Sequence, residues 1–212
     1  MKILLIIPAY NEEENILNTC KKIDEYNTKA KNKLDYVVIN DGSKDRTEEI
    51  LVKNKINHVS LIHNLGIGGA VQTGYKYARE NGYDVAVQFD GDGQHDVEYV
   101  KNIVEPISKG EANMVIGSRF IEKDDNNFKS TLARRIGIRI ISFFIKLFSE
   151  VYPTEYPEPV SEVSVLRKKY KVKEVYVKMH ERQGGKSSIK AWKNAYYMIN
   201  VTVAMFIESL KR

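Results

Sequence analysis

Residues 84–95 read DVAVQFDGDGQH, an apolar run that passes directly into an acidic turn. The run at 84–89 has the length and the valine content that are typical of a buried strand. The turn carries two carboxylates, Asp90 and Asp92, and the glycines between and after them let the backbone turn and approach a ligand closely. This combination predicts a ligand site at the carboxyl end of a strand.

Similar apolar runs recur on both sides of this stretch, with amphipathic segments between them. We predict strands at residues 2–7, 35–40, 58–62, 84–89 and 113–116, and helices at 13–26, 47–53, 69–81 and 97–108. Short apolar strands that alternate with helices predict an α/β fold, in which a mostly parallel twisted sheet carries helices on both faces.

The polar and glycine residues gather in the segments that follow the predicted strands. These segments are PAYNE at 8–12, DGSKD at 41–45, NLGIGG at 64–69, DGDGQH at 90–95 and GSR at 117–119. In open parallel sheets, ligands bind beyond the carboxyl ends of the strands. We therefore expect the site at that edge of the sheet.

The chemistry of this edge follows from its oxygen atoms. Asp90 and Asp92 offer hard ligands that suit Mg²⁺ or Mn²⁺ shared with a diphosphate, and Gln94 is a candidate third ligand. An acidic turn with no metal is an alternative for the aspartate pair taken alone. Asp41 can accept hydrogen bonds from a base or ribose, or it can belong to an ordinary turn before a helix. The glycine-rich stretch at 64–74 is interpreted mainly as a tight turn between strand and helix, because it matches no dinucleotide or P-loop pattern.

Composition and charge narrow the class of protein. Of 212 residues, 42% are hydrophobic, which is enough for a core. Cys20 is the single cysteine, so no internal disulfide forms, and no Cys/His spacing predicts zinc. The net charge of +5 is unevenly distributed. Residues 1–128 carry 16 Lys and Arg against 21 Asp and Glu, a net charge of −5, whereas residues 129–212 carry 17 Lys and Arg against 7 Asp and Glu, a net charge of +10. The basic part predicts a surface for phosphates or an anionic membrane, or a solvated basic face. No nucleic-acid-binding signature is found.

The second part of the chain has a different pattern. We expect a loop at 121–129, a basic amphipathic helix at 131–148, an irregular stretch at 150–159, a strand at 172–178 and a helix at 189–210. The helix at 131–148 fits either a membrane interface or a core position with a basic face. We expect no transmembrane span and, because the first apolar run is too short for a signal sequence, a cytoplasmic protein.

Five motifs in order carry a resemblance to a known family. They are PAYNE at 8–12, NDGSxD at 40–45, NxGxGxA at 64–70, DGDxQH at 90–95 and GSR at 117–119. The set resembles family 2 glycosyltransferases, in the branch of dolichyl-phosphate mannose synthases and bacterial polyprenyl-phosphate glycosyltransferases. The resemblance covers residues 3–148 and resumes near Tyr152.

The resemblance implies a GT-A fold, a nucleotide-sugar donor with UDP-sugar favoured, a divalent metal and inversion at the anomeric carbon. It also implies a nucleotide-sugar-binding core at 1–130 and an acceptor-side, membrane-facing extension of the same domain at 131–212. The residues carried over are Pro8, Tyr10, Glu12, Ile39 and Asp41 for the nucleoside, Asp90, Gly91, Asp92 and Gln94 for metal and diphosphate, Arg119 and Arg134 for the acceptor phosphate, and Arg182 with Lys186 for the donor diphosphate. Of these, Asp92, Arg119 and Arg134 are the expected catalytic residues, while a solvated helix face is an alternative for Arg134.

The implied acceptor is a polyprenyl phosphate at the inner face of the plasma membrane, where the enzyme is expected to bind peripherally. A lipid phosphate is already an anionic nucleophile, so positioning and charge stabilisation suffice, whereas a hydroxyl acceptor would need a carboxylate base. Transfer to a saccharide hydroxyl and an inactive sugar-nucleotide-binding scaffold are the alternatives. A small membrane partner protein could supply an anchor, and self-association is left open.

The sequence departs from the family between Phe148 and Tyr152. Members of this branch carry a segment similar to Asp-Pro-x-Ser-Gly-Phe after the amphipathic helix, and this chain runs directly into Tyr152-Pro153. We expect a missing stretch here rather than a naturally shortened chain, because such a loop borders the acceptor site.

Overall fold

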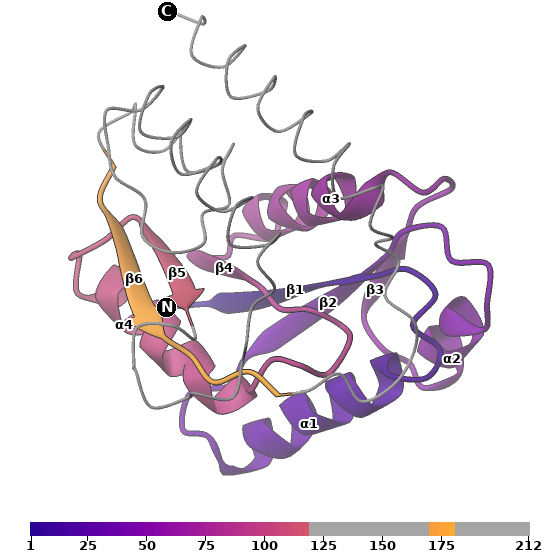
Figure 1. Cartoon of the computed structure of the whole chain (residues 1–212), viewed down its shortest axis with the longest axis horizontal. Coiled ribbons are helices and arrows are strands. Elements are labelled where there is room, and N and C mark those ends of the chain that lie inside the picture. Colours follow the sequence, from indigo (N-terminus) through magenta and orange to yellow (C-terminus); the bar gives the residue numbers. More distant parts are fainter. Residues whose placement is uncertain (119–169, 181–212) are drawn as a thin grey trace, which may run out of the picture. The chain divides into compact units, whose positions relative to one another are not determined.

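The computed structural model describes residues 1–118 and 170–180 (Figure 1). These residues divide between two compact units, one with residues 1–101 and 178–180 and the other with residues 102–118 and 170–177. The predicted helices at 131–148 and 189–210 and the predicted irregular segments lie outside the described residues, as does the predicted domain boundary at residue 130. Among the helices that the structure describes, none is long and apolar enough to cross a membrane.

The first unit is built on a parallel sheet of four strands. These are β1 (Ile3–Ala9), β2 (Asp35–Asn40), β3 (His58–Ser60) and β4 (Val85–Gln88), in the spatial order β3-β2-β1-β4. β1 pairs with β2 on one side and with β4 on the other. Leu4, Leu5, Ile6 and Ile7 in this strand are all 0% exposed. A continuous apolar run is what a parallel strand needs when both faces of its sheet are covered.

Helices cover both faces of this sheet. Figure 1 shows α3 (Gly66–Glu80) on one face, and α1 (Ile16–Lys29) and α2 (Thr47–Lys53) on the other. On the α3 side, a buried cluster joins the strands to the helix, and its members are Leu4, Ile6, Val37, Ile39, Ala70 and Ala78. A Cβ atom on Gly74 would lie 2.2 Å from Cγ2 of Ile6, so α3 can approach β1 only because this position is a glycine.

The predicted elements of the first unit are confirmed, and some of their ends differ. β1 continues through Pro8 to Ala9 and stays paired with β2 along this length. Pro8 has no N–H to donate, but the pairing of β1 with β4 already ends at Ile6, so the proline interrupts no pairing with β4. α1 begins at Ile16 rather than residue 13, since the main-chain oxygen of Glu12 accepts hydrogen bonds from the N–H groups of Asn15 and Ile16 in a preceding turn. The predicted helix at 97–108 is a 3-10 turn, η1 (Val97–Tyr99), followed by α4 (Val100–Ser108).

The second unit contains a separate parallel pair of strands. β5 (Met114–Ser118) pairs with β6 (Val172–Tyr176) over five residues each, from Met114 opposite Val172 to Ser118 opposite Tyr176. Both strands were predicted. We expected β5 to continue the series of parallel strands, whereas its partner within the described residues is β6. Backbone pairing across more than fifty residues has no local signal in the sequence.

Candidate active site

The strand order places three loops of the predicted site next to one another. β1 lies between β2 and β4, so the loop that follows it has the loops after β2 and β4 as its neighbours. The carboxyl ends of parallel strands meet at one edge of the sheet. The strand order therefore places the segment from Tyr10 to Glu12 between the loop that begins at Asp41 and the loop that contains Asp90.

The loop after β4 is fixed to the sheet and to α1 at its centre. The N–H of Phe89 donates to the oxygen of Ile6 at 2.9 Å. A Cβ atom on Gly91 would lie 3.2 Å from the main-chain oxygen of Pro8, which explains why a glycine stands between the two aspartates. The hydroxyl of Thr19, a buried residue of α1, donates to the oxygen of Gly91 at 3.0 Å. The backbone between the two carboxylates is thus anchored by Thr19 and lies close against Pro8.

Both carboxylates keep part of their surface accessible. The side chain of Asp90 is 36% exposed, and Gln88 Nε2 donates to its Oδ1 at 3.3 Å. Asp92 is half-buried, and its Oδ1 accepts from the N–H of Gln94 at 3.1 Å. The side-chain amide of Gln94 donates through Nε2 to the main-chain oxygen of His180 at 3.3 Å, so among residues 1–118 and 170–180 its Oε1 remains available as a ligand atom.

The donor set fits a Mg²⁺ or Mn²⁺ ion that is shared with a substrate phosphate. Among residues 1–118 and 170–180, no group of three or more His, Cys, Asp or Glu side chains is arranged to hold a metal by itself. Mg²⁺ commonly takes only one or two protein carboxylates and completes its coordination with water and phosphate oxygens. Two accessible aspartates on a fixed loop match that requirement.

The residues predicted for the nucleoside differ in accessibility. Tyr10 is 36% exposed, whereas Asp41 is 3% exposed. Oδ1 of Asp41 accepts from the N–H of Leu65 at 2.7 Å, and its main-chain oxygen accepts from Asn64 Nδ2 at 3.1 Å. One oxygen of the Asp41 carboxylate therefore holds the loop after β3. Ile39 is 0% exposed and its side chain packs in the core, so the fold leaves none of its surface open to a ligand.

The remaining two predicted nucleoside contacts have structural partners of their own. Pro8 is half-buried at the end of β1, with its oxygen beside Gly91. The N–H of Glu12 donates to the hydroxyl of Thr47 at 3.0 Å, and Glu12 Oε2 accepts from Asn15 Nδ2 at 2.9 Å. Glu12 therefore joins the loop after β1 to both α1 and α2.

Sequence reasoning missed how closely the loops after β1 and β2 are joined. The N–H of Asn11, which has φ of 55°, donates to the hydroxyl of Ser43 at 3.0 Å, and Oδ1 of Asn11 accepts from the N–H of Lys44 at 2.8 Å. The N–H of Glu13 donates to Oδ2 of Asp45 at 3.1 Å. The turn residues at 41–45 were the available signal, but their partners lie more than thirty residues away in the chain.

Asp45 is the anchor of this connection. Its Oδ1 accepts from both the N–H and the hydroxyl of Thr47, at 3.0 and 2.6 Å. Burial raises the pKa of Asp45, but the hydrogen bonds from Thr47 and from the N–H of Glu13 outweigh burial and hold the pKa below its ordinary value. The carboxylate form is thus stabilised by the fold.

A second unpredicted contact joins the loop after β4 to residues far along the chain. His95 forms an antiparallel bridge with Met179, and the N–H of His180 donates to the oxygen of Gln94 at 2.7 Å. His180 Nε2 lies 3.2 Å from Oδ2 of Asp96. These contacts bring the chain that precedes Arg182 to the candidate metal loop. Four predicted site residues lie outside the described residues, and they are Arg119, Arg134, Arg182 and Lys186.

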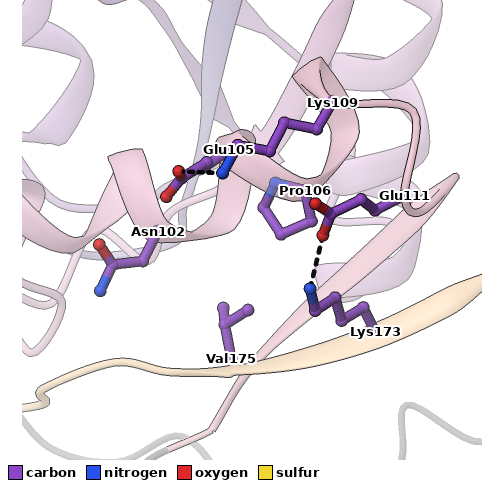
Figure 2. A pocket seen from close by; sticks show the side chains of 7 residues that line it. All are labelled: Asn102, Glu105, Pro106, Lys109, Glu111, Lys173 and Val175. Carbon is purple, nitrogen blue, oxygen red and sulfur yellow. Dashed lines mark hydrogen bonds and ion pairs between the residues drawn. The ribbon is translucent and has the colours of Figure 1, made fainter.

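A cavity of about 370 Å³ in the second unit contains none of the predicted site residues. Figure 2 shows its lining from α4, β6 and the segment between α4 and β5, formed by Asn102, Glu105, Pro106, Lys109, Glu111, Lys173 and Val175. Its charged residues pair with one another, Lys109 with Glu105 at 2.7 Å and Lys173 with Glu111 at 2.6 Å. The cavity is therefore a hydrophilic surface hollow within the second unit.

Comparison with known proteins agrees with the class that the fold and the site define. The parallel sheet with its acidic loop is that of a GT-A glycosyltransferase. The model of glycosyl transferase family 2 matches residues 4–183, and the chain belongs to this family. In fold, it is similar to glucosyl-3-phosphoglycerate synthase from Mycobacterium tuberculosis, solved with Mn²⁺, uridine diphosphate and phosphoglyceric acid. The TM-score is 0.70 at 16% identity, with 98% of this chain and 78% of that chain covered.

Relatives within the polyprenyl-phosphate branch are more similar in sequence. The UDP-N-acetylglucosamine–dolichyl-phosphate N-acetylglucosaminyltransferase of Methanococcus voltae is 33% identical over 171 residues, covering 72% of this chain and 65% of the relative. The undecaprenyl-phosphate mannosyltransferase of Micrococcus luteus is 34% identical over 124 residues, covering 56% of this chain and 49% of the relative. The chain thus spans about half to two thirds of the length of these relatives.

Proposed function

We propose that this chain transfers a hexose from a nucleotide-diphosphate sugar, with UDP-sugar favoured, to a polyprenyl phosphate at the inner face of the plasma membrane, with inversion at the anomeric carbon. The observation that carries the proposal is the aspartate pair at the carboxyl edge of β4. Thr19 anchors the backbone between the two aspartates, and the loop that follows β1 flanks it. The named acceptors of the relatives from Methanococcus voltae and Micrococcus luteus support the choice of a lipid phosphate.

The donor would bind across the loops after β1, β2 and β4. Tyr10, which is partly exposed, and the second carboxylate oxygen of Asp41 would contact the nucleoside, while Asp90, Asp92 and Gln94 would hold the diphosphate side through Mg²⁺ or Mn²⁺. When bound, this ion would neutralise the charge that develops on the departing nucleotide diphosphate. The fixed backbone at Gly91 keeps the two carboxylates in a constant geometry, so little reorganisation is needed when the donor binds.

Four basic residues outside the described residues complete the proposal. Arg182 follows His180 by two residues, and the contacts of His180 with Gln94 and Asp96 support a role for Arg182 and Lys186 on the donor diphosphate. Arg119 and Arg134 would bind the acceptor phosphate, since guanidinium groups pair with phosphate oxygens in a planar fork. Residues 1–130 would then form the donor-binding core, and residues 131–212 the acceptor-side, membrane-facing extension.

The test is a transfer assay with the full chain. Labelled UDP-glucose, UDP-N-acetylglucosamine and GDP-mannose are each incubated with Mn²⁺ and either undecaprenyl or dolichyl phosphate, and label is measured in the organic phase. We expect a lipid-linked sugar with at least one donor. The absence of a lipid-linked product with every combination would contradict the proposed function. Transfer of label only to a saccharide supplied in place of the lipid would contradict the proposed acceptor.

A pair of variants makes the assay specific to the site. Asp92→Asn removes one carboxylate at the carboxyl end of β4 and keeps an acceptor for the N–H of Gln94, so we expect transfer and Mn²⁺-dependent UDP binding to be lost. Asp84→Asn makes the same change in charge just before the start of β4, where the carboxylate of Asp84 accepts a hydrogen bond from the N–H of Lys2. This control should leave both sugar transfer and Mn²⁺-dependent UDP binding unchanged. Equal behaviour of the two variants would contradict the metal assignment.

A further inference from the structure

Each oxygen of the Asp90 carboxylate faces a side chain that is not itself a predicted ligand. Gln88 Nε2, at the end of β4, donates to Oδ1 at 3.3 Å. His95 Nε2, from the far side of the turn, lies 3.5 Å from Oδ2. The carboxylate is therefore bracketed by two nitrogen atoms, while 36% of the Asp90 side chain stays open to a ligand.

The partners of the His95 ring define which nitrogen carries the proton. Nδ1 lies 3.4 Å from the main-chain nitrogen of Asp90, a group that can only donate. Nδ1 is therefore the acceptor, and in the neutral ring the proton is on Nε2, the atom that faces the carboxylate. The same residue thus receives a hydrogen bond from the main chain of Asp90 and presents an N–H to its side chain.

The ring of His95 is held in place by groups outside this pair. It stands edge-on to the buried ring of Phe89, with 5.3 Å between the ring centres and 86° between the planes. Its main chain bridges to Met179. A ring fixed in this way can determine the direction of a neighbouring carboxylate instead of following it.

We propose that His95 and Gln88 are positioning residues, which set the orientation of the Asp90 carboxylate for a divalent metal. This inference rests on the proposed metal site of the glycosyltransferase. Hydrogen-bond partners of a metal ligand commonly change metal affinity by about 10- to 100-fold when they are removed. Both contacts of Asp90 are long for hydrogen bonds, so their loss should alter metal binding much more than stability.

Two substitutions separate the functions of the two ring nitrogens. In His95→Gln, the amide nitrogen can reach the position of Nε2 and keep a donor to Asp90. In His95→Asn, the shorter amide can reach only the position of Nδ1 and keep an acceptor for the N–H of Asp90. His63→Asn, at an exposed position in the loop after β3, is the matched control.

The experiment is a calorimetric titration of the full chain with Mn²⁺, in the presence and absence of UDP, together with a thermal melt of each variant. We expect His95→Asn and Gln88→Leu each to weaken Mn²⁺ binding by about 10- to 100-fold. We expect His95→Gln to recover most of the affinity and His63→Asn to match the wild type. The Tm of each of these four variants should differ from that of the wild type by less than about 2 °C.

The outcomes distinguish this inference from the proposed function. Equal losses of affinity in His95→Gln and His95→Asn, each with a lower Tm, would show that the ring only packs, and would overturn the positioning role. Unchanged affinity in His95→Asn and Gln88→Leu, with metal binding abolished in Asp90→Asn, would overturn it while the metal site stands. A wild-type chain that binds no Mn²⁺, with or without UDP, would overturn the metal site itself and this inference with it.

Discussion

Replacing Thr19 by valine removes one hydrogen bond between α1 and the loop that carries the aspartate pair. The hydroxyl of Thr19 donates to the main-chain oxygen of Gly91 at 3.0 Å, and both residues are buried, Thr19 with only 2% of its surface exposed. Valine has nearly the shape of threonine, so the principal change is that the oxygen of Gly91 loses this donor without gaining water. Leaving a buried acceptor unsatisfied costs about 1–3 kcal/mol.

The assay is a urea titration followed by circular dichroism, together with a thermal melt. For a chain of this size, each kcal/mol of destabilisation lowers Tm by about 2–4 °C. Thr28→Val is the matched control on the same helix, because the hydroxyl of Thr28 also donates to a main-chain oxygen, that of Glu25 at 2.7 Å, but at an exposed position. An exposed substitution of this kind should change stability by no more than about 0.5 kcal/mol.

The comparison of the two valine variants tests whether the hydrogen bond from Thr19 to Gly91 stabilises the fold. A free energy of unfolding that falls only for Thr19→Val supports a buried connection between α1 and the metal loop. Equal midpoints for the wild type and both variants would refute it, because the oxygen of Gly91 would then need no donor from the helix. Equal losses in both variants would also refute it, since they would reflect the preference of valine within a helix.

Two further predictions concern the loops beside the site. Gly42→Ala and Gly82→Ala both place a side chain at φ near 65°, which costs about 1–2 kcal/mol, but only at Gly42 would the new Cβ meet main chain, 2.9 Å from the nitrogen of Asn64. Gly42→Ala should therefore lower Tm more than Gly82→Ala, and equal shifts in thermal melts would contradict this. Because the folded pKa of Asp45 is lowered, its contribution to stability is present above about pH 4 and is lost as the pH falls through the folded pKa. Urea midpoints between about pH 3 and 6 should fall less steeply in Asp45→Asn, and profiles of equal slope would contradict the role of this carboxylate.

The predicted elements follow from patterns that a few neighbouring residues carry. The apolar runs that became β1, β2 and β4 differ from the observed bounds by at most two residues at either end, and α2 and the start of η1 coincide with the prediction. Burial on both faces makes a parallel strand apolar along its length, and burial of one helix face repeats apolar residues every three or four positions. The position of the site at one edge followed from the alternation of these elements.

Sequence patterns were less successful in predicting which side chains of the site are accessible to a ligand. Asp90 and Asp92 lie at the expected strand end with accessible oxygens, while Ile39 contributes its side chain to the core. Asp41 uses one carboxylate oxygen to hold Leu65. A motif names a residue but does not say whether its side chain faces a ligand or a neighbouring loop. That depends on how the strands are ordered and on what lies against each face.

The sequence by itself determined the α/β class, the edge of the sheet that carries the polar residues, and the carboxylate pair, because each of these depends on local periodicity or on residue type. Only the tertiary structure decided that β5 pairs with β6, that Asp45 joins the loops after β1 and β2, and that His180 contacts Gln94 and Asp96. Each of these contacts joins segments that are distant in the sequence. Their hydrogen bonds depend on direction and distance in space, which local patterns of hydrophobicity do not encode.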